Sequence, residues 1–438
     1  MVIKMNIAFD REKVLKSYIE NKEKLDKRNR EGIEKYRKGN FKLKFTDDVK
    51  KVHIHQTKHK FLFGCTAFML NSFEVPEKEE KFKSLFTNLF NQAVVPFYWS
   101  DLEPEEGKVR FDRNSENIYR RPAPDIVVDF CRQYGIEPKG HCLTWNWFVP
   151  QWLEKYGSED RKRILERRFK EIAERYGDII PSFDIVNESA SNYRIGKNTL
   201  FENYDEIALE LGGKYFKNNI KILNETNEAI WRDYVTEGKY MAFNMQLKEF
   251  IRKGLPIDEI GLQYHIFHPA EAFEGNETFL NAEYMMEILD IYDAYNLPMH
   301  ISEITIPSYS GKIPQNEEIQ AEIAEILYTT WFATRNMKSI VWWNLVDGYA
   351  AYAPLGSEDG ENKYAGGLVH FDMTKKPAYE ALDRLINHEW KTNINTETKN
   401  GEYSFRGFYG EYEIEIETVS GIEKHTVVLD KDNMEVAL

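Results

Sequence analysis

The sequence has few cysteines, and they show no pattern. Cys65, Cys131 and Cys142 are the three cysteines among 438 residues, and no two of them have C-x-x-C spacing. Their odd number and scattered positions argue against a disulfide framework and against a cysteine zinc site. We therefore expect free thiols and a reducing compartment, the cytoplasm.

Long apolar runs are also missing. The longest uncharged run, residues 84–100, contains three amides, a threonine and a proline. It is too polar for a membrane helix, which needs about 20 apolar residues. Residues 1–10 have no apolar stretch followed by a small-residue cleavage site, so they do not resemble a secretory signal. We expect no membrane partner, and a secreted protein only if a leader has been removed.

Positive charge is scarce as well. Lys and Arg number 58 against 72 Asp and Glu, which gives a net charge of −14. A surface of this sign repels a phosphate backbone, so no nucleic-acid partner is expected. With 42 % hydrophobic and 30 % charged residues, the composition is that of a globular protein. This length fits roughly three domains, or one barrel of about 250 residues with additions.

The two ends of the chain differ in pattern from its middle. Residues 10–38 are rich in Lys and Glu, with apolar residues at helical spacing, which predicts a solvated amphipathic helix. Residues 41–63 alternate between apolar and polar types, which predicts two or three antiparallel strands. Residues 403–416 and 426–429 alternate again between glycine turns. We expect both ends to pair into one small accessory β-domain that mainly packs against the rest.

In the middle of the chain, apolar runs alternate with helical stretches, which is typical of βαβ units. We count eight runs, at residues 62–68, 94–99, 138–145, 182–188, 221–226, 260–266, 299–305 and 340–345. Helical patterns follow most of them, at residues 79–90, 124–134, 160–176, 241–252, 279–295 and 317–335. Eight strands in this alternation predict an α/β fold, a (β/α)8 TIM barrel.

The expected domains follow from these patterns. Residues 1–62 hold the N-terminal helix and the first part of the accessory β-domain, residues 63–390 hold the barrel, and residues 391–438 hold the second part of the β-domain. In a TIM barrel, chemistry gathers at the C-terminal ends of the strands. Polar residues that end apolar runs are therefore the candidates for function.

Two carboxylates end runs of the predicted barrel. Glu188 closes the fourth run and Glu303 lies near the end of the seventh. The fourth and seventh strands of a closed barrel face each other across its mouth. Paired carboxylates suit glycosidase chemistry, with retention at a separation of about 5–5.5 Å and inversion where a water fits between them. From spacing alone, each glutamate is more often a structural carboxylate, either satisfied at the end of its strand or paired with Lys or Arg.

Five motifs occur in one order along the chain, at residues 140–145, 184–188, 261–265, 300–303 and 343–347. Between Phe63 and Tyr379 the sequence resembles glycoside hydrolase family 10, whose members are mainly retaining endo-β-1,4-xylanases. The resemblance implies that Glu188 is the catalytic acid/base and that Glu303 is the nucleophile.

The resemblance also implies contacts to the sugar at the cleavage point. Asn187 would hydrogen-bond the 2-hydroxyl of this sugar, and the remaining contacts would come from His141, Trp145, Gln263, His265 and Trp343. Sugars present apolar faces and a fringe of hydroxyls, so a cleft needs aromatic platforms beside donors and acceptors. Taken singly, such a Trp or His is at least as often structural.

Several positions depart from the family pattern. Tyr98 stands where the family has Lys, and Val94 and Val95 stand where it has Glu-Asn, the residues that bind the second and third sugars on the non-reducing side. Asn146 replaces a second His, and Thr305 replaces an Asp that normally supports a histidine. We keep Tyr98 and Asn146 among the expected substrate contacts, and we expect altered specificity together with a changed setting for the supported histidine.

We therefore expect a retaining glycosidase that cleaves β-1,4-xylosidic bonds in xylan or xylo-oligosaccharides. One alternative keeps the fold and mechanism but acts on another glycan, and a second is a non-catalytic carbohydrate-binding barrel. No cofactor or metal is expected, because no H-x-x-x-H helix accompanies the candidate zinc ligands His53, His55, His59, His265 and His268. Nothing in the sequence indicates an oligomeric state.

Overall fold

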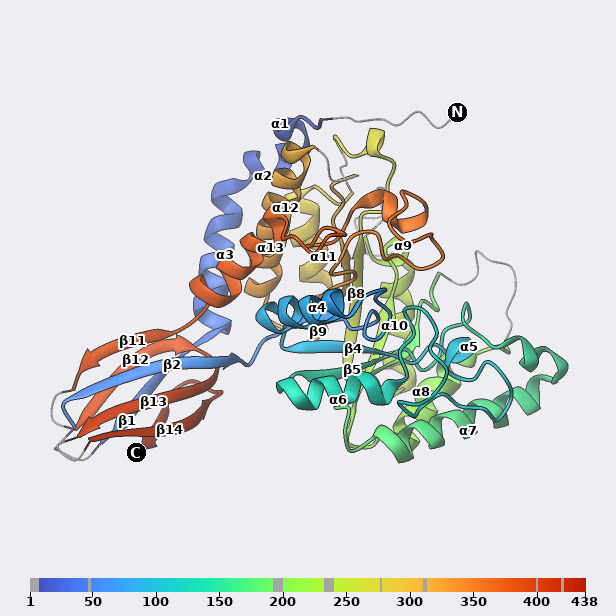
Figure 1. Cartoon of the computed structure of the whole chain (residues 1–438), viewed down its shortest axis with the longest axis horizontal. Helices are drawn as coiled ribbons and strands as arrows, with labels where there is room; N and C mark the ends of the chain where they lie inside the picture. Colours follow the sequence, from blue (N-terminus) through green and yellow to red (C-terminus); the bar gives the residue numbers. More distant parts are fainter. Residues whose placement is uncertain are drawn as a thin grey trace.

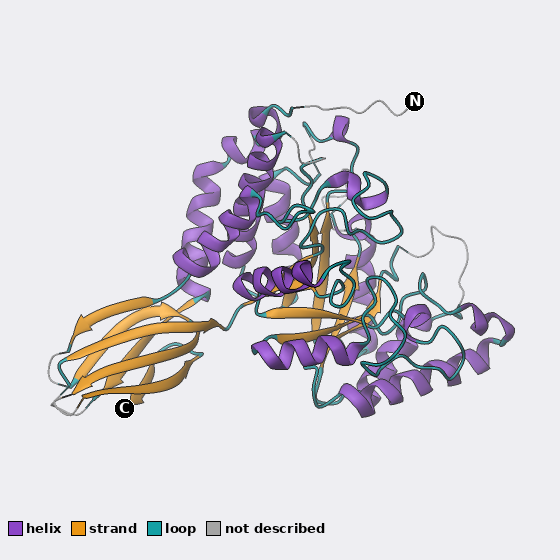
Figure 2. Cartoon of the chain, in the orientation of Figure 1, coloured by secondary structure: helices purple, strands orange, loops and turns teal. Residues whose placement is uncertain are grey.

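The computed structural model describes residues 8–45, 49–191, 200–231, 240–275, 278–309, 313–398, 401–418 and 421–438. Residues 1–7 of the N-terminal segment considered above lie outside these ranges. Eight parallel strands form a closed barrel, and two further sheets form a β-domain beside it (Figures 1 and 2). The predicted (β/α)8 barrel with additional terminal strands is confirmed. No helix in the described ranges has the length and apolarity that a membrane crossing requires.

Each predicted apolar run forms one strand of the barrel. Around the barrel the order is β10-β3-β4-β5-β6-β7-β8-β9. The runs extend beyond several strands because the apolar character continues into loops that line the mouth. The strands are β3 (Leu62–Thr66), β4 (Gln92–Pro96), β5 (Glu137–His141), β6 (Ser182–Asn187), β7 (Ile220–Glu225), β8 (Glu259–His265), β9 (Met299–Thr305) and β10 (Met337–Trp342).

Helices surround the barrel strands. α6 begins with Pro124, where a missing N–H costs nothing, and ends at Gly135, whose φ of +66° suits glycine. α8 was not predicted, because a Gly-Gly pair near its end weakens the helical pattern. The longer helices are α4 (Pro76–Leu89), α6 (Pro124–Tyr134), α7 (Ser158–Tyr176), α8 (Tyr204–Tyr215), α10 (Ala242–Lys253), α11 (Ala282–Asp293) and α12 (Pro314–Ala333). Short helices are α5 (Trp99–Leu102), α9 (Asn227–Ile230) and α13 (Pro377–Asp383).

The N-terminal helical segment differs from its prediction in one way. It is divided into α1 (Arg11–Val14), α2 (Lys16–Glu20) and α3 (Lys22–Tyr36). Its apolar face packs on the barrel, as an amphipathic helix should, because Tyr18 and Leu25 are buried in the main core.

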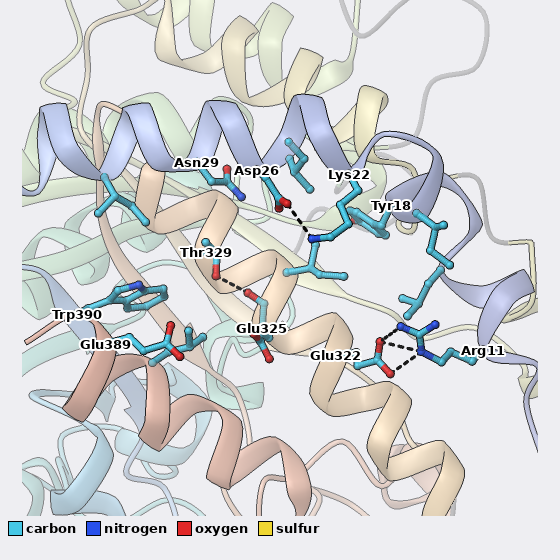
Figure 3. Close-up of a pocket in the computed structure, with 16 residues that line it drawn as sticks. Arg11, Tyr18, Lys22, Asp26, Asn29, Glu322, Glu325, Thr329, Glu389 and Trp390 are labelled. Atoms are coloured by element: carbon cyan, nitrogen blue, oxygen red, sulfur yellow. Dashed lines mark hydrogen bonds and ion pairs between the residues drawn. The ribbon is translucent and has the colours of Figure 1, made fainter.

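A groove of about 450 Å³ separates α2 and α3 from α12 (Figure 3). The bidentate ion pair of Arg11 with Glu322 lies at one end of the groove, and Trp390 lies at the other. Where α3 and α12 come closest, Gly32 faces the backbone of Ala333. The groove therefore belongs to the packing of the N-terminal helices on the barrel.

The β-domain joins both ends of the chain. One sheet has the order β12-β1-β15 and the other β11-β2-β13-β14. Strands from the two ends of the chain pair with one another. β1 and β2 each lie between C-terminal strands, in different sheets, and β1 pairs with β15 in parallel. The strands are β1 (Lys38–Lys44), β2 (Lys51–His59), β11 (Asn393–Glu397), β12 (Glu402–Phe408), β13 (Gly410–Thr418), β14 (Gly421–Leu429) and β15 (Met434–Ala437).

The β-domain lies at the N-terminal ends of the barrel strands. β2 leads directly into the start of β3, and the ring of His59 contacts the backbone oxygen of Ile386 at 3.1 Å. Lys58 donates to the oxygen of Gly135, just before β5, at 3.0 Å. The domain projects sideways from this end of the barrel (Figure 1). The mouth, where the candidate carboxylates lie, is at the opposite end. The domain limits at residues 62 and 391 stay a prediction.

The close approach of α3 to α12 gives a stability prediction. A Cβ at Gly32 would lie 2.2 Å from the carbonyl oxygen of Ala333, so Gly32→Ala must force the two helices apart. We expect a loss of about 1–3 kcal/mol of unfolding free energy, as for other overpacked sites, measured by urea denaturation. Glu31→Ala, at the exposed neighbouring position, is the control and leaves stability nearly unchanged. Equal stability of the two variants would contradict this packing.

Candidate active site

The two candidate glutamates lie at the C-terminal ends of β6 and β9. Glu188 follows the last residue of β6 and has a left-handed backbone with φ of +55°, which turns the chain sharply at the mouth. Glu303 lies within β9 and is 4 % exposed, whereas Glu188 is partly exposed. Within the described ranges, neither forms an ion pair with Lys or Arg. The reading of both as structural ion-pair carboxylates therefore has no support.

Two donors hold the carboxylate of Glu303. His265 Nε2 lies 3.2 Å from Oε2, and Asn224 Nδ2 donates to Oε1 at 3.0 Å. Because a carboxylate only accepts, Nε2–H is the donor in the first of these bonds. The other ring nitrogen of His265 lies 2.8 Å from the hydroxyl of Thr305, which orients the ring without adding a charge of its own.

Glu188 has the properties of a proton donor. Burial raises the pKa of its carboxyl well above the ordinary value, and the negative charge of Glu303 raises this pKa further. Gln263 donates from Nε2 to Glu188 Oε1 at 2.8 Å, and this bond lowers the pKa only in part. Glu188 therefore keeps its proton to a higher pH than an ordinary glutamate, as a general acid requires.

One side-chain amide connects the two halves of the site. Asn224, in β7, donates from the same Nδ2 to Glu303 and to Asn187 Oδ1, the latter at 2.7 Å. The position of Asn187 relative to Glu303 is thereby fixed. Asn224 was missed from the sequence, although it lies near the end of the fifth apolar run in the way that Asn187 ends the fourth.

A buried ion-pair network orients His141. Its Nδ1 lies 2.7 Å from Asp184 Oδ2, and Lys139 donates to the same oxygen at 2.6 Å. Burial would raise the pKa of Asp184, but the charges and hydrogen bonds of Lys139 and His141 outweigh it and lower this pKa to about 2. His141 Nε2 then points toward Glu303, 3.9 Å from Oε1. Lys139 and Asp184 lie inside apolar runs, where a strand-end search does not find them.

Three predicted sugar contacts carry buried polar atoms without a partner. In the described part of the chain, no hydrogen-bond partner reaches His141 Nε2, Trp145 Nε1 or Asn187 Nδ2. A buried polar atom without a hydrogen bond costs about 1–3 kcal/mol, so a ligand that supplied the missing bonds would be favoured here. Sugar hydroxyls both donate and accept, and they suit all three atoms.

Aromatic rings form one side of the mouth. Trp343, just after β10, packs edge-on against His141 and His265 at centroid distances of 5.8 and 5.6 Å. Trp145 packs on Phe148 at 4.8 Å and on Tyr98 at 5.8 Å. These rings supply the apolar surface that a sugar face requires.

Two of the predicted contacts are covered by other protein groups. Tyr98 is buried beneath other side chains, and the amide oxygen of Asn146 accepts a hydrogen bond from the backbone N–H of Leu200 at 3.2 Å. The other predicted residues gather around the two glutamates: His141, Trp145, Asn187, Gln263, His265 and Trp343.

A third carboxylate supports the turn after β6. Glu225, at the end of β7, accepts hydrogen bonds from Ala190 N at 2.7 Å, from Ser191 Oγ at 3.2 Å and from Thr226 N at 2.8 Å. Burial raises the pKa of Glu225 to about 7. Its contacts are to the segment just after Glu188, so Glu225 positions that turn. It lies one residue before the end of the predicted run at residues 221–226, so a search of the strand ends would have found it.

The histidines considered as zinc ligands are dispersed. His53 and His55 lie on β2 of the β-domain, whereas His265 is engaged by Glu303 and Thr305 in the barrel. In the ranges that the structure describes, no three His, Cys, Asp or Glu side chains form a cluster suited to a metal ion.

A parallel eight-stranded barrel with two such glutamates at its mouth, one with a raised pKa and both beside aromatic rings and unpaired polar atoms, is the arrangement of the barrel glycosidases. The sequence model of glycosyl hydrolase family 10 matches residues 55–384 of the chain. The chain therefore belongs to glycosyl hydrolase family 10, and the resemblance seen in its five motifs is confirmed.

Curated relatives extend beyond this chain. Endo-1,4-beta-xylanase 2 of Arabidopsis thaliana is 24 % identical over 404 residues, covering 88 % of this chain and 32 % of the relative. Anti-sigma-I factor RsgI6 of Acetivibrio thermocellus is 26 % identical over 421 residues, covering 91 % of this chain and 47 % of the relative. The chain thus spans about a third to a half of the length of these relatives.

Solved structures share the fold. Xylanase 10B from Thermotoga petrophila RKU-1, in complex with xylobiose, is 21 % identical, with a TM-score of 0.57. The match covers 75 % of this chain and 95 % of that protein. The part of this chain beyond the match is comparable in size to the terminal helices and the β-domain.

The proximity of the glutamates predicts a shift that does not depend on turnover. The charge of Glu303 raises the pKa of Glu188, so Glu303→Gln, which removes that charge, lowers the pKa of Glu188. We expect the lower pKa of Glu188 to be seen in a 13C NMR titration of protein labelled at its glutamate carboxyl groups. The signal of Glu188 is assigned as the one that is missing in Glu188→Gln. Glu271→Gln, an exposed glutamate in the loop after β8, leaves the pKa of Glu188 unchanged. An unshifted signal in Glu303→Gln would refute the electrostatic coupling.

Proposed function

We propose that this protein is a retaining glycoside hydrolase that cleaves β-1,4-xylosidic bonds in xylan or xylo-oligosaccharides. The observation that carries the proposal is the unequal setting of Glu188 and Glu303. Glu188 has a raised pKa and one amide donor, whereas two donors, His265 and Asn224, stabilise the charge on Glu303. Two carboxyl groups with such different surroundings suit the roles of acid and nucleophile.

In the first step, Glu303 attacks the anomeric carbon while Glu188 gives its proton to the glycosidic oxygen. The bond from the anomeric carbon to that oxygen breaks, a glycosyl ester of Glu303 forms, and the alcohol leaves with the proton. Esterification removes the charge of Glu303, so one cause of the raised pKa of Glu188 disappears. Glu188 is then a base that takes a proton from water, and this water releases the sugar.

The side chains around the first sugar suit its transition state. The oxocarbenium-like state develops positive charge on the ring, and hydrogen bonds to the 2-hydroxyl strengthen there. Asn187 Nδ2 has no partner in the described protein, and the bond from Asn224 to its oxygen fixes its direction. Preorganised donors of this kind need no rearrangement during the reaction.

Xylose as the sugar is supported by the relatives. The plant relative is named an endo-1,4-beta-xylanase, and so is a relative from Caldicellulosiruptor saccharolyticus, endo-1,4-beta-xylanase A. The Thermotoga petrophila xylanase with the same fold was solved with xylobiose. We extend this sugar class to the present chain.

One alternative is a barrel that binds carbohydrate without turnover. The relative that matches 91 % of this chain is named an anti-sigma-I factor and not a glycosidase. Binding alone, however, does not require the raised pKa of Glu188 or the two donors on Glu303. Sugar hydroxyls need only hydrogen-bond donors or acceptors, whatever their pKa. The intact pair therefore favours catalysis.

The test compares variants of the two glutamates on aryl β-xylosides and aryl β-xylobiosides. Glu303→Gln should lower kcat on the order of 10⁴-fold or more, because the nucleophile is lost. Glu188→Ala should lower the rate by about 10²–10⁴-fold for a leaving group that needs a proton, but far less for a dinitrophenyl group that does not. Glu271→Gln is the surface control.

The same reaction reports the stereochemistry. We expect the β-anomer of the product first, followed by mutarotation, in 1H NMR spectra. If the α-anomer appeared first, the mechanism would be inverting and not retaining. If the wild-type protein bound the sugar but showed no turnover that is lost in Glu303→Gln, the non-catalytic binding barrel would be favoured.

A further inference from the structure

The chain between α5 and α6 crosses one side of the mouth. We call residues 103–123 the strap. Arg110, which is buried, joins its two ends, donating to the backbone oxygens of Asp101 at 2.8 Å, Glu116 at 2.9 Å and Arg121 at 3.2 Å. Because these bonds go to the backbone, they fix the path of the strap itself.

The strap is also tied to the loops after β3 and β10. Asn117 donates to the oxygen of Asn71 at 3.1 Å, and the backbone N–H of Arg120 donates to Ser72 Oγ at 3.2 Å. The buried guanidinium of Arg120 reaches the loop after β10, where it donates to Asn344 Oδ1 at 2.8 Å. The strap therefore spans from β4 across β3 to β10.

The strap covers Tyr98 with a cation. The guanidinium of Arg121 lies 4.0 Å from the centroid of the Tyr98 ring, and Asp101 holds it in place through an ion pair at 2.9 Å. Phe148 packs on the same ring at 4.7 Å. As a result Tyr98 is 2 % exposed, although it lies just beyond the end of β4, where a side chain would otherwise face the mouth.

The covered side is the donor side of the site. The residue that protonates the glycosidic oxygen must lie beside the leaving group, so the donor sugar points away from Glu188. Glu188 follows β6, and β10 is four strands away in either direction around the barrel, flanked by β3. The strap thus lies where the chain of sugars on the non-reducing side would leave the mouth.

We propose that the strap ends the donor side after one sugar, so that the enzyme removes single xylose units from the non-reducing ends of xylo-oligosaccharides instead of cutting within the chain. The inference rests on the proposed function and narrows it to chain ends. The first sugar would lie over Glu303, beside His141 and Trp343, and the Tyr98–Arg121 stack would occupy the space of a second. Arg121 is then a residue that determines specificity through Tyr98 and makes no contact with the reacting atoms.

The first test measures binding by calorimetry, with no turnover required. The probes are a xylose-configured imino sugar of the isofagomine type and its β-1,4-xylosyl derivative, which adds one sugar on the non-reducing side. The cationic ring suits the place between the carboxylates. We expect wild type to bind the monosaccharide probe at least about tenfold more tightly. Tighter binding of the disaccharide probe would overturn the inference and leave the proposed function standing.

The second test follows xylohexaose labelled at its reducing end. A closed donor side releases xylose and labelled xylopentaose first, whereas an open cleft releases labelled fragments of several shorter lengths. A protein that binds neither probe and hydrolyses no xyloside would contradict the proposed function, and the inference with it.

Variants of the strap test whether Arg121 causes the preference for the monosaccharide probe. Arg121→Ala removes the cation over Tyr98 and should improve binding of the disaccharide probe relative to the monosaccharide probe by about tenfold. Arg113→Ala is the matched control, because Arg113 lies on the strap but pairs with Asp129 on the exposed side of α6. If Arg121→Ala does not fold, the wild-type comparison still decides. An unchanged probe preference in folded Arg121→Ala would overturn the role of Arg121.

Discussion

Two carboxyl groups that share one partly buried site cannot both be ionised without a large cost, and the structure of the mouth depends on this constraint. The protein answers it by giving the two groups different partners. Glu303 accepts from His265 and Asn224, while Glu188 has the single amide of Gln263 and a raised pKa. The barrel fold supplies the geometry, since only a closed sheet brings the ends of β6 and β9 to face one another.

The same constraint explains the composition of the surrounding shell. A cation close to Glu303 would lower the energy of its charge but would also weaken Glu303 in its proposed role of nucleophile. Lys139 is close by, yet its charge is taken up by Asp184 at 2.6 Å, so it orients His141 without pairing with Glu303. Thr305 acts similarly, because a hydroxyl can orient His265 without adding a charge. In the described ranges, Glu303 is thus held by His265 and Asn224 and forms no ion pair with Lys or Arg.

Much of this could be predicted from the sequence, because it depends on local patterns. The eight strands followed from apolar runs, and Glu188 and Glu303 followed from the polar ends of two of them. Lys139 and Asp184 could not be found in this way, because a buried ion pair inside a barrel interrupts apolar runs as any polar residue would. β11 and β15 were missed for another reason: both are short, and neither has a fully buried side chain that would make its apolar pattern clear.

Tyr98, which stands where the family has Lys, shows where sequence reasoning is weakest. Considered as a single position, it suggests a lost hydrogen bond to a sugar. In the structure Tyr98 is covered by Arg121, whose place depends on Asp101, and the strap is held by Arg110 and Arg120 through bonds to distant loops. A lysine at position 98 would place a second positive charge against the Arg121 guanidinium, so the tyrosine and the strap are compatible only together. The altered position and the closed donor side are therefore one structural change.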